Sequence, residues 1–225
     1  MSDATPTRTY RSPRREESAR QTRAAILEAA AELFIANGYG GTSVDAIAER
    51  AGVSKPTVFT AVGNKATVLK VARDVAMAGD DEPVPVMQRP AYVELLADPD
   101  PYRTVRRIAA LSTGLLARYA ALDEVLHGAA DSDAELRELW AASEAQRLAA
   151  ARTYVANLAG KGPLRPGLAL EAAADLLWLH IAPSNYFRLA ISRGWSDDRF
   201  EQWLGDAVIH HLLPVPPPTN KEKNQ

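Results

Sequence analysis

Residues 51–65, AGVSKPTVFTAVGNK, bring polar side chains together at the spacing of one short helix. Gly52 supplies a turn, and Ser54 is placed to cap a helix over residues 55–62. The segment contains the polar residues Lys55, Thr57 and Thr60, with Lys65 at the start of the next helix. Such ammonium and hydroxyl groups contact phosphates and base edges when a helix enters a DNA major groove, which is about 12 Å wide. The same glycine-marked pattern also fits the corner of an ordinary helical hairpin.

A second short helix precedes this one and is placed to brace it. The segment TSVDAIAERA, residues 42–51, offers Thr42 as an N-cap with Asp45 three residues later, which is close to a capping box. Its apolar face consists of Val44, Ile47, Ala48 and Ala51. A groove-reading helix with another helix crossing behind it is the helix-turn-helix arrangement, so residues 42–62 are a candidate DNA-reading motif.

The composition argues against several other kinds of site. There is no cysteine, which excludes disulfides and thiolate chemistry, and the four histidines show no HExxH or other metal-ligand spacing. No GxSxG motif or recognisable carboxylate pair occurs, so we expect no metal, no cofactor and no enzymatic activity. GYGG, residues 38–41, follows a helix rather than a strand, which argues against a phosphate-binding loop. With neither a long apolar span nor an apolar signal core, a cytoplasmic protein without a membrane partner is expected.

The net charge of −2 hides a difference between the two ends of the chain. Residues 1–74 hold 11 Lys and Arg against 8 Asp and Glu, so the remaining residues hold 15 against 20. The front is therefore the part suited to a polyanionic partner. Residues 1–16 lack apolar periodicity and are predicted to form a flexible basic arm, which either assists DNA binding or is only a solvated tail.

Helical periodicity continues through the rest of the chain, without a convincing strand-like alternation. A helix is predicted from Glu17 to Gly38, which suits the left-handed position that closes helices. Pro and acidic residues at 80–101 leave room for one short helix, near residues 92–96. Further helices are predicted at 102–120, 122–130, 134–159, 168–193 and 197–213. The expected organisation is all-α, with a helix-turn-helix domain at 17–64, a connecting helix at 65–79, a helical domain at 80–213 and a disordered tail at 214–225.

At greater length, ILEAAAELFIANGYGGTSVDAIAERAGVSKPTVFTAVGNKATVL resembles the tetracycline-repressor (TetR) family of transcriptional regulators. The resemblance extends from the helix that begins near Glu17 to Lys65, whereas the remainder is similar in architecture only. It implies an N-terminal three-helix DNA-binding domain and a C-terminal helical domain for ligand binding and dimerisation. The implied function is that of a homodimeric, ligand-responsive repressor, which a small apolar or amphipathic molecule releases from its double-stranded DNA operator.

The resemblance also implies which residues contact DNA. Hydroxyl groups at the start of the second helix would hold a phosphate, the third helix would read the groove, and arginines near the N-terminus would add backbone or minor-groove contacts. The full set is Arg20, Arg23, Thr42, Ser43, Ser54, Lys55, Thr57, Phe59, Thr60 and Lys65. Phe59 departs from the usual tyrosine, and the lost hydroxyl is worth about 0.5–1.5 kcal/mol as a hydrogen bond. Ala61 and Val62 also stand where the family usually has an aromatic residue.

The C-terminal domain offers candidates for a ligand pocket and for a dimer interface. Aromatic side chains with a few polar groups are typical of small-molecule sites, although aromatic residues at helical spacing in an all-α domain more often belong to the core. The predicted pocket residues are Tyr119, His127, Trp140, Tyr154, Trp178 and His180. The predicted interface comprises Leu176, Leu179, Phe187, Ile191, Trp203, Leu204 and Ala207, unless these residues complete the core of a single chain.

Two other functions remain open. A DNA-binding regulator without a small-molecule effector would show the same motif, but it would not need a second helical domain. A helical enzyme is the less favoured reading, because the acidic residues fall mostly on the exteriors of predicted helices, where charge usually serves solvation.

Overall fold

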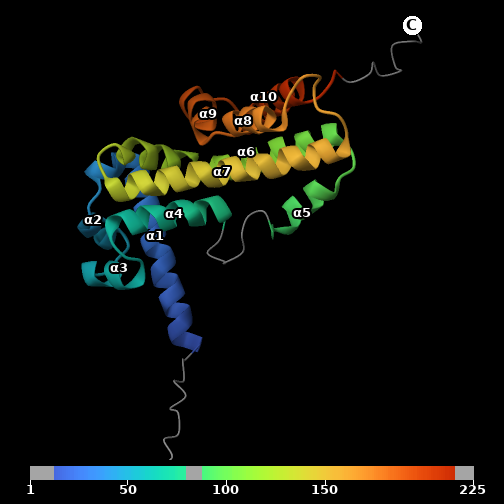
Figure 1. Cartoon of the computed structure of the whole chain (residues 1–225). Helices are drawn as coiled ribbons and strands as arrows, with labels where there is room; N and C mark the ends of the chain where they lie inside the picture. Colours follow the sequence, from blue (N-terminus) through green and yellow to red (C-terminus); the bar gives the residue numbers. More distant parts are fainter. Residues whose placement is uncertain (1–12, 80–87, 216–225) are drawn as a thin grey trace, which may run out of the picture. The chain divides into compact units, whose positions relative to one another are not determined.

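The computed structural model describes residues 13–79 and 88–215, and within these ranges every regular element is helical (Figure 1). The chain divides into two compact units, residues 1–72 and 73–225. The helix α4, Lys65–Ala78, contains the division between them. None of the described helices is long and apolar enough to cross a membrane.

The first unit is a small bundle of α1 (Pro13–Gly41), α2 (Val44–Arg50), α3 (Lys55–Ala61) and the first half of α4. Its apolar positions recur at helical spacing, so each helix has one face to bury. Side chains that meet in the centre with no exposed surface are Ile26, Ala30, Phe34, Ile47, Val58, Val68 and Leu69. This core holds the short helices α2 and α3 against α1.

The long helix α1 begins at Pro13, four residues before the predicted start at Glu17. The predicted flexible arm over 1–16 is therefore wrong for residues 13–16, and its residues 1–12 lie outside the described part of the chain. Proline is suited to a first helical turn, where its missing N–H has no helical partner. Near the other end, Gly38 has a φ of 69° and breaks the regular helical geometry, as its predicted closing position requires.

The N-cap of α2 is Ser43, not Thr42. The Oγ of Ser43 accepts a hydrogen bond from the backbone N–H of Ala46 at 3.0 Å. Thr42 is only 2% exposed, and its hydroxyl lies 3.0 Å from the carbonyl oxygen of Leu33 and 2.9 Å from that of Gly38. The hydroxyl of Thr42 thus donates to carbonyl oxygens near the C-terminal end of α1. The next residue, Ser43, is therefore the N-cap of α2.

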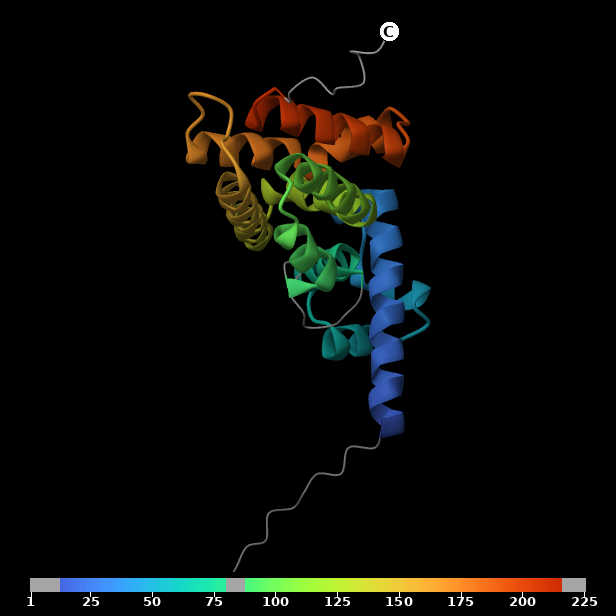
Figure 2. The same ribbon diagram turned by 90° about the vertical axis from the view of Figure 1, so that its right-hand side faces the viewer.

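The second unit combines the end of α4 with α5 (Pro90–Ala97) and two long helices, α6 (Pro101–Ala130) and α7 (Ala134–Lys161). After them come α8 (Leu170–His180), α9 (Pro183–Tyr186), the π-helical turn η2 (Phe187–Ser192) and α10 (Asp197–Leu212). The helix α6 packs against α7 and α10, and α8 packs against α7 and α10 (Figure 2). Four helices thus surround one shared core.

Two predicted helix boundaries in this unit are wrong. The segments 102–120 and 122–130 form the single helix α6. Conversely, the predicted helix over 168–193 is interrupted after His180, because proline removes a backbone donor and disfavours helical geometry in the residue before it. Accordingly, Ala182 is extended with a ψ of 133°, and Pro183 begins a new short helix.

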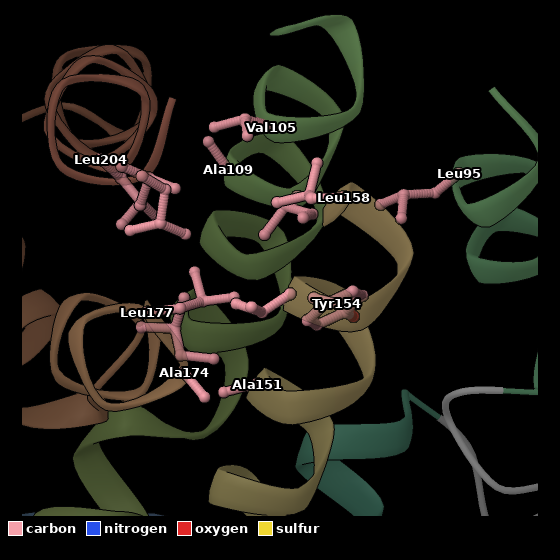
Figure 3. Packing of buried hydrophobic residues seen from close by; sticks show 14 of the residues in the cluster. Leu95, Val105, Ala109, Ala151, Tyr154, Leu158, Ala174, Leu177 and Leu204 are labelled. Carbon is pink, nitrogen blue, oxygen red and sulfur yellow. The ribbon is translucent and has the colours of Figure 1, made fainter. Parts of the chain in front are cut away.

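The core of the second unit settles the position of one predicted interface residue. Leu204 has no exposed surface and lies in the same apolar cluster as Val105, Ala109 and Leu177 (Figure 3). Its side chain already packs inside a single chain. The prediction that Leu204 lies at a dimer interface is therefore wrong, and the alternative that it completes the core of one chain holds for this residue.

Candidate nucleic-acid interface and ligand cavity

The helix α3 is fixed by a cap at its start and one buried side chain at its centre. Ser54 is the N-cap, and its Oγ accepts a hydrogen bond from the backbone N–H of Thr57 at 3.3 Å. The turn before it passes through Gly52 at a φ of 66°, a left-handed conformation that favours glycine. Val58 is fully buried and anchors the inner side of the helix. These contacts determine which side of α3 remains outside.

The exposed side of α3, which we call the α3 face, consists of Lys55, Pro56, Phe59 and Thr60. These positions follow the helical period, and Phe59 is 47% exposed although it is a large apolar residue. The Thr60 hydroxyl donates to the carbonyl oxygen of Pro56 at 2.9 Å. An exposed aromatic ring beside an ammonium and a hydroxyl group is unusual for a purely structural helix. It suits contact with a partner.

Of the predicted DNA contacts on α3, Thr57 and Ser54 are less free than the others. Thr57 is half-buried, and its hydroxyl lies 2.7 Å from that of Ser54. The hydrogen bond between these hydroxyls and the backbone N–H that Ser54 Oγ accepts leave part of their hydrogen-bonding capacity for a partner. The α3 face is therefore flanked at its N-terminal end by two mutually bonded hydroxyl groups.

Lys55 is held by a carboxylate from the neighbouring helix. Its Nζ lies 2.9 Å from an Oδ2 of Asp45 in α2, and both side chains are well exposed, at 49% and 69%. An exposed ion pair of this kind contributes only about 0–1 kcal/mol, because water and salt screen it. The pair orients Lys55 over the α3 face without preventing an exchange of partner.

Two further predicted contacts are also oriented by neighbours. The Nζ of Lys65, at the start of α4, lies 4.0 Å from the centroid of the Tyr39 ring, a cation–π contact. The guanidinium of Arg20 forms an exposed ion pair with Glu17, one turn earlier in α1. Neither arrangement buries the charge, so both side chains could turn toward a phosphate.

The structure gives Arg23 and Thr42 other partners than the predicted phosphate. Arg23 donates from its Nη1 to the carbonyl oxygen of Ala61 at 2.9 Å, which satisfies an acceptor in the last turn of α3. Thr42 is buried with its hydroxyl between two carbonyls, so a phosphate cannot reach it in this conformation. The phosphate contact predicted for Thr42 is corrected accordingly. The exposed Ser43 remains the candidate at the start of α2.

A cavity of about 420 Å³ lies within the second unit, at a size typical of small-molecule sites. Its wall is mostly apolar and comes from the end of α4, from α5, α6 and α7, and from the segment around Pro183. The apolar lining residues are Met77, Leu115, Leu116, Ala150, Ile181 and Pro183. The polar or aromatic lining residues are Arg73, Tyr92, Ser112, Tyr119, Ser143, Glu144, Gln146, Arg147 and Tyr154.

Three of these lining residues are buried tyrosines. Tyr92, Tyr119 and Tyr154 are 8%, 3% and 5% exposed. Burial raises the pKa of each phenol, and for Tyr119 the nearby Asp123 raises the pKa further, against the opposing effect of Arg73. No residue in the described part of the chain forms a hydrogen bond with any of the three hydroxyls.

Both arginines in the cavity wall are paired. Arg73 of α4 donates from its Nε to the Oδ1 of Asp123 in α6 at 2.7 Å, and the two side chains are only 7% and 10% exposed. Arg147 forms an ion pair with Glu144, donates to the carbonyl of Trp178, and stacks 4.6 Å above that indole ring. The cations at this cavity are therefore already neutralised.

Of the six predicted pocket residues, Tyr119 and Tyr154 line this cavity and the other four do not. His127 is exposed and stacks on Trp140 at 4.8 Å between ring centroids. Trp178 lies behind Arg147, and His180 packs against Trp203 and His211. Their helical spacing indicated apolar surroundings, but helix rotation turned these four side chains away from the cavity.

Several cavity residues were not predicted. Tyr92 and Arg147 carry no local pattern that separates them from other helical aromatic and charged residues. Arg73 carries one usable signal in the sequence, because it follows the apolar stripe of Val68, Leu69 and Ala72. In the structure, only 6% of its surface is exposed. A buried arginine needs a carboxylate partner, and Asp123 provides it.

The remaining predicted interface residues lie near one side of the second unit. Leu179 and Ile191 are 55% and 48% exposed, which is unusual for large apolar residues. Phe187 and Ala207 are half-buried, while Leu176 and Trp203 are half-buried against the core. A groove beside Trp203 and Ala207 is lined further by Trp195, Arg199 and Asp206.

Comparison with known proteins points to transcriptional regulators. Residues 26–72 match the family model described as "Bacterial regulatory proteins, tetR family". YdeS, an uncharacterized HTH-type transcriptional regulator of Bacillus subtilis (strain 168), is 29% identical over 190 residues, which cover 84% of this chain and 87% of YdeS.

Solved structures share the fold. NalD, the secondary repressor of the MexAB-OprM multidrug efflux pump in Pseudomonas aeruginosa, matches with a TM-score of 0.65 and 24% identity, over 87% of this chain and 97% of NalD. A regulator from Saccharomonospora viridis in complex with choline matches with a TM-score of 0.66 and 22% identity, over 87% of this chain and all of the other, at 100%. At these identities the likeness concerns the fold alone.

Proposed function

We propose that this chain, of which residues 26–72 match the model of the tetR family of bacterial regulatory proteins, is a homodimeric repressor released from its operator by a small molecule. The family consists of DNA-binding transcriptional regulators rather than enzymes, so the helical-enzyme alternative is set aside. In the proposal, the α3 face reads the operator and the cavity of the second unit takes the effector. NalD, which shares the fold, is itself a repressor, and this supports repression over activation.

The observation that carries the proposal is the composition of α4. This single helix begins with Lys65, a candidate phosphate contact, and its later residues Arg73 and Met77 line the cavity. In the proposal, a change in the position of the last turns of α4 acts on the helix that begins with Lys65. No other described helix contributes both to the candidate DNA contacts and to the cavity wall.

The end of α4 is tied to α6 by two arginines. Arg73 pairs with Asp123, as described above. Arg118 donates from Nε to the carbonyl of Ala76 at 3.1 Å and from Nη2 to that of Met77 at 3.0 Å, so it caps the last turn of α4. An effector that repacks the cavity wall would move α4 through these contacts. It needs only to bind the non-operator conformation more tightly.

Dimerisation makes such a movement effective. Two heads must meet successive major-groove faces, at about 34–36 Å or a multiple, so a small change in their separation weakens binding. We assign the interface to the exposed Leu179 and Ile191 together with the half-buried Leu176, Phe187, Trp203 and Ala207, which an isologous two-fold contact would cover. A polar substitution such as Ile191→Glu should convert a dimer to a monomer on a sizing column, and an unchanged profile would place the interface elsewhere.

A gel shift with the DNA upstream of the chain's own coding region tests DNA binding. The double variant Lys55→Gln/Lys65→Gln should lose affinity and show a flatter dependence on salt, because fewer phosphates are neutralised. Arg137→Gln, which removes one exposed positive charge from the second unit, is the matched control and should bind normally. Absence of binding by the unaltered chain at low salt would end the repressor proposal. Equal affinity of the double variant would reject the α3 face as the reading surface.

A further inference from the structure

We infer that the cavity of the second unit takes an uncharged, largely apolar molecule with oxygen or nitrogen acceptors, which the phenol groups of Tyr92, Tyr119 and Tyr154 bind. This inference rests on the proposed function, since it specifies the class of effector. The inference is based on the polar groups of the cavity wall, some of which already have hydrogen-bond or ion-pair partners in the protein while others do not.

The three phenol hydroxyls have no hydrogen-bond partner among the described residues. They come from three helices, α5, α6 and α7, and line one cavity. Each residue is more than nine-tenths buried, and none of the hydroxyls has a hydrogen bond from the described residues. A ligand that accepts hydrogen bonds from these hydroxyls would supply a partner that the described residues do not. Figure 3 shows Tyr154 on α7, one helical turn before Leu158.

The protonation of these phenols sets the complementary group on the ligand. Burial raises the pKa of Tyr119 and of Tyr154 well above the ordinary range, and it raises that of Tyr92 as well. The phenols therefore keep their protons at any physiological pH and can donate hydrogen bonds. Carbonyl, ether, hydroxyl or ring-nitrogen acceptors on a ligand meet this requirement.

An anionic ligand is disfavoured because the cations of the wall are committed. Arg73 is bound to Asp123, and Arg147 is bound to Glu144 and to the carbonyl of Trp178. A carboxylate or phosphate would have to displace one of these partners and leave a carboxylate unpaired in a buried position. Breaking a buried pair in this way is strongly unfavourable.

A cationic ligand is disfavoured for a different reason. Three aromatic rings could in principle surround a quaternary ammonium, as in aromatic cages. Here, however, the guanidinium of Arg73 already lies 5.1 Å from the centroid of the Tyr119 ring, and Arg147 lines the same cavity. Choline, which the Saccharomonospora viridis regulator binds, would have to share the Tyr119 ring with Arg73, and Glu144, the carboxylate of the cavity lining, is already paired with Arg147. Because the charged groups of the wall are paired with one another, the neutral class of ligand remains.

Three probes of matched size separate the classes. The ketone 2-acetylnaphthalene, the anion 2-naphthoate and the cation trimethyl(2-naphthyl)ammonium would be titrated into the full chain by calorimetry. We expect the ketone to bind at least tenfold more tightly than either ion. A charged probe that binds as tightly as the ketone, or a ketone that does not bind, would overturn the inference.

Removal of single hydroxyls tests the phenols directly. Tyr119→Phe and Tyr154→Phe keep the ring and should each weaken ketone binding about two- to tenfold, the value of one hydrogen bond. Tyr186→Phe is the control, because Tyr186 lies outside the cavity lining and donates its hydroxyl to Asp197 at 2.5 Å. If both cavity variants bind the ketone with full affinity, the phenols do not hold the ligand. Two variants are used so that the test remains possible if one of them fails to fold.

The outcome is independent of the DNA experiment. A chain that prefers the ketone but never shifts operator DNA would retain the ligand class and lose the repressor proposal. A chain that binds operator DNA and prefers the anion would lose the ligand class and retain the repressor proposal.

Discussion

Two ion pairs of nearly the same length serve opposite purposes in this molecule. Lys55 and Asp45 meet at 2.9 Å beside the α3 face, with both side chains about half or more exposed. Arg73 and Asp123 meet at 2.7 Å behind the cavity wall, with both side chains nearly buried. Solvent makes the first pair weak and exchangeable, whereas burial makes separation of the second pair costly. Exposure, rather than distance, distinguishes a charge available to a partner from a charge that fixes a helix.

The largest expected effect on stability comes from removing the cation of the buried ion pair and leaving its anion in place. Arg73→Met should lower the free energy of unfolding by about 3–5 kcal/mol, because Asp123 then remains buried without a partner. Urea denaturation followed by circular dichroism measures the change. The double variant Arg73→Met/Asp123→Leu removes both charges and should recover most of the loss. If the single variant loses less than about 1 kcal/mol, the pair does not anchor α4.

The exposed pair should show the opposite behaviour when its cation is removed. Lys55→Gln should leave the unfolding free energy within about 0.5 kcal/mol of the original, as is usual for surface substitutions. Its DNA affinity should fall, and the slope of log affinity against log salt should become shallower by about 0.9, corresponding to one phosphate contact. Gel shifts over a range of salt concentrations measure the slope. An unchanged slope would mean that Lys55 contacts no phosphate.

Removal of the anion from the exposed pair sharpens the comparison further. Asp45→Asn frees Lys55 from its competitor, so affinity for any duplex should rise by a few-fold, consistent with about 0.2–1 kcal/mol for such a pair. The variant should be compared on operator DNA and on a duplex of unrelated sequence. A gain confined to the operator, or a loss of affinity, would contradict a simple exchange of partners.

Asp98 is an intermediate case, because only one of the two side chains in its ion pair is buried. Its carboxylate is 6% exposed, while its partner Arg103 is 58% exposed. The hydrogen bond from the Arg103 guanidinium at 2.6 Å, and then the backbone N–H of Asp100, lower the pKa of Asp98 to about 2. Because the folded pKa lies below the ordinary value of 3.8, the stabilisation is complete above that pH and is lost as pH falls toward 2.

Thermal unfolding of the unaltered chain and of Asp98→Asn between pH 5 and pH 2 would measure this contribution. The range extends from about one unit above the ordinary pKa of 3.8 down to the folded pKa of about 2. The unaltered chain should lose stability more steeply than the variant below pH 4 or so. If the stability of the two proteins fell in parallel as the pH is lowered, another carboxylate would be responsible for the loss of stability at acid pH.

The α3 face was accessible to prediction because its residues lie within one short segment. Lys55, Phe59 and Thr60 fall on one side of a helix whose cap, Ser54, and buried anchor, Val58, are its own neighbours. The cap of α2 was displaced by one residue, because Thr42 and Ser43 both carry hydroxyls and only burial against the end of α1 distinguishes them. Local sequence was sufficient to predict this face. It failed only at the cap of α2, where a tertiary contact determines which of two neighbouring hydroxyl residues is the N-cap.

The cavity was less predictable because its wall is assembled from distant segments. Tyr119 and Tyr154 were among the candidates, but so were four residues that helix rotation directs elsewhere. Arg73 and Tyr92 reach the wall only because α4 and α5 pack in the same unit as α6 and α7. The break before Pro183 could have been recognised from the sequence, since proline inside a predicted helix marks a boundary.

That break has a thermodynamic consequence. Ile181 and Pro183 line the cavity, while Leu179 and Phe187, a few residues to either side, belong to the proposed dimer interface. Under the two proposals, one short stretch of backbone lies next to both the ligand and the second subunit. If an effector shifts this stretch, binding of effector and association of subunits are linked reciprocally, and each changes the equilibrium constant of the other by the same factor. The measured affinity for the effector would then depend on protein concentration.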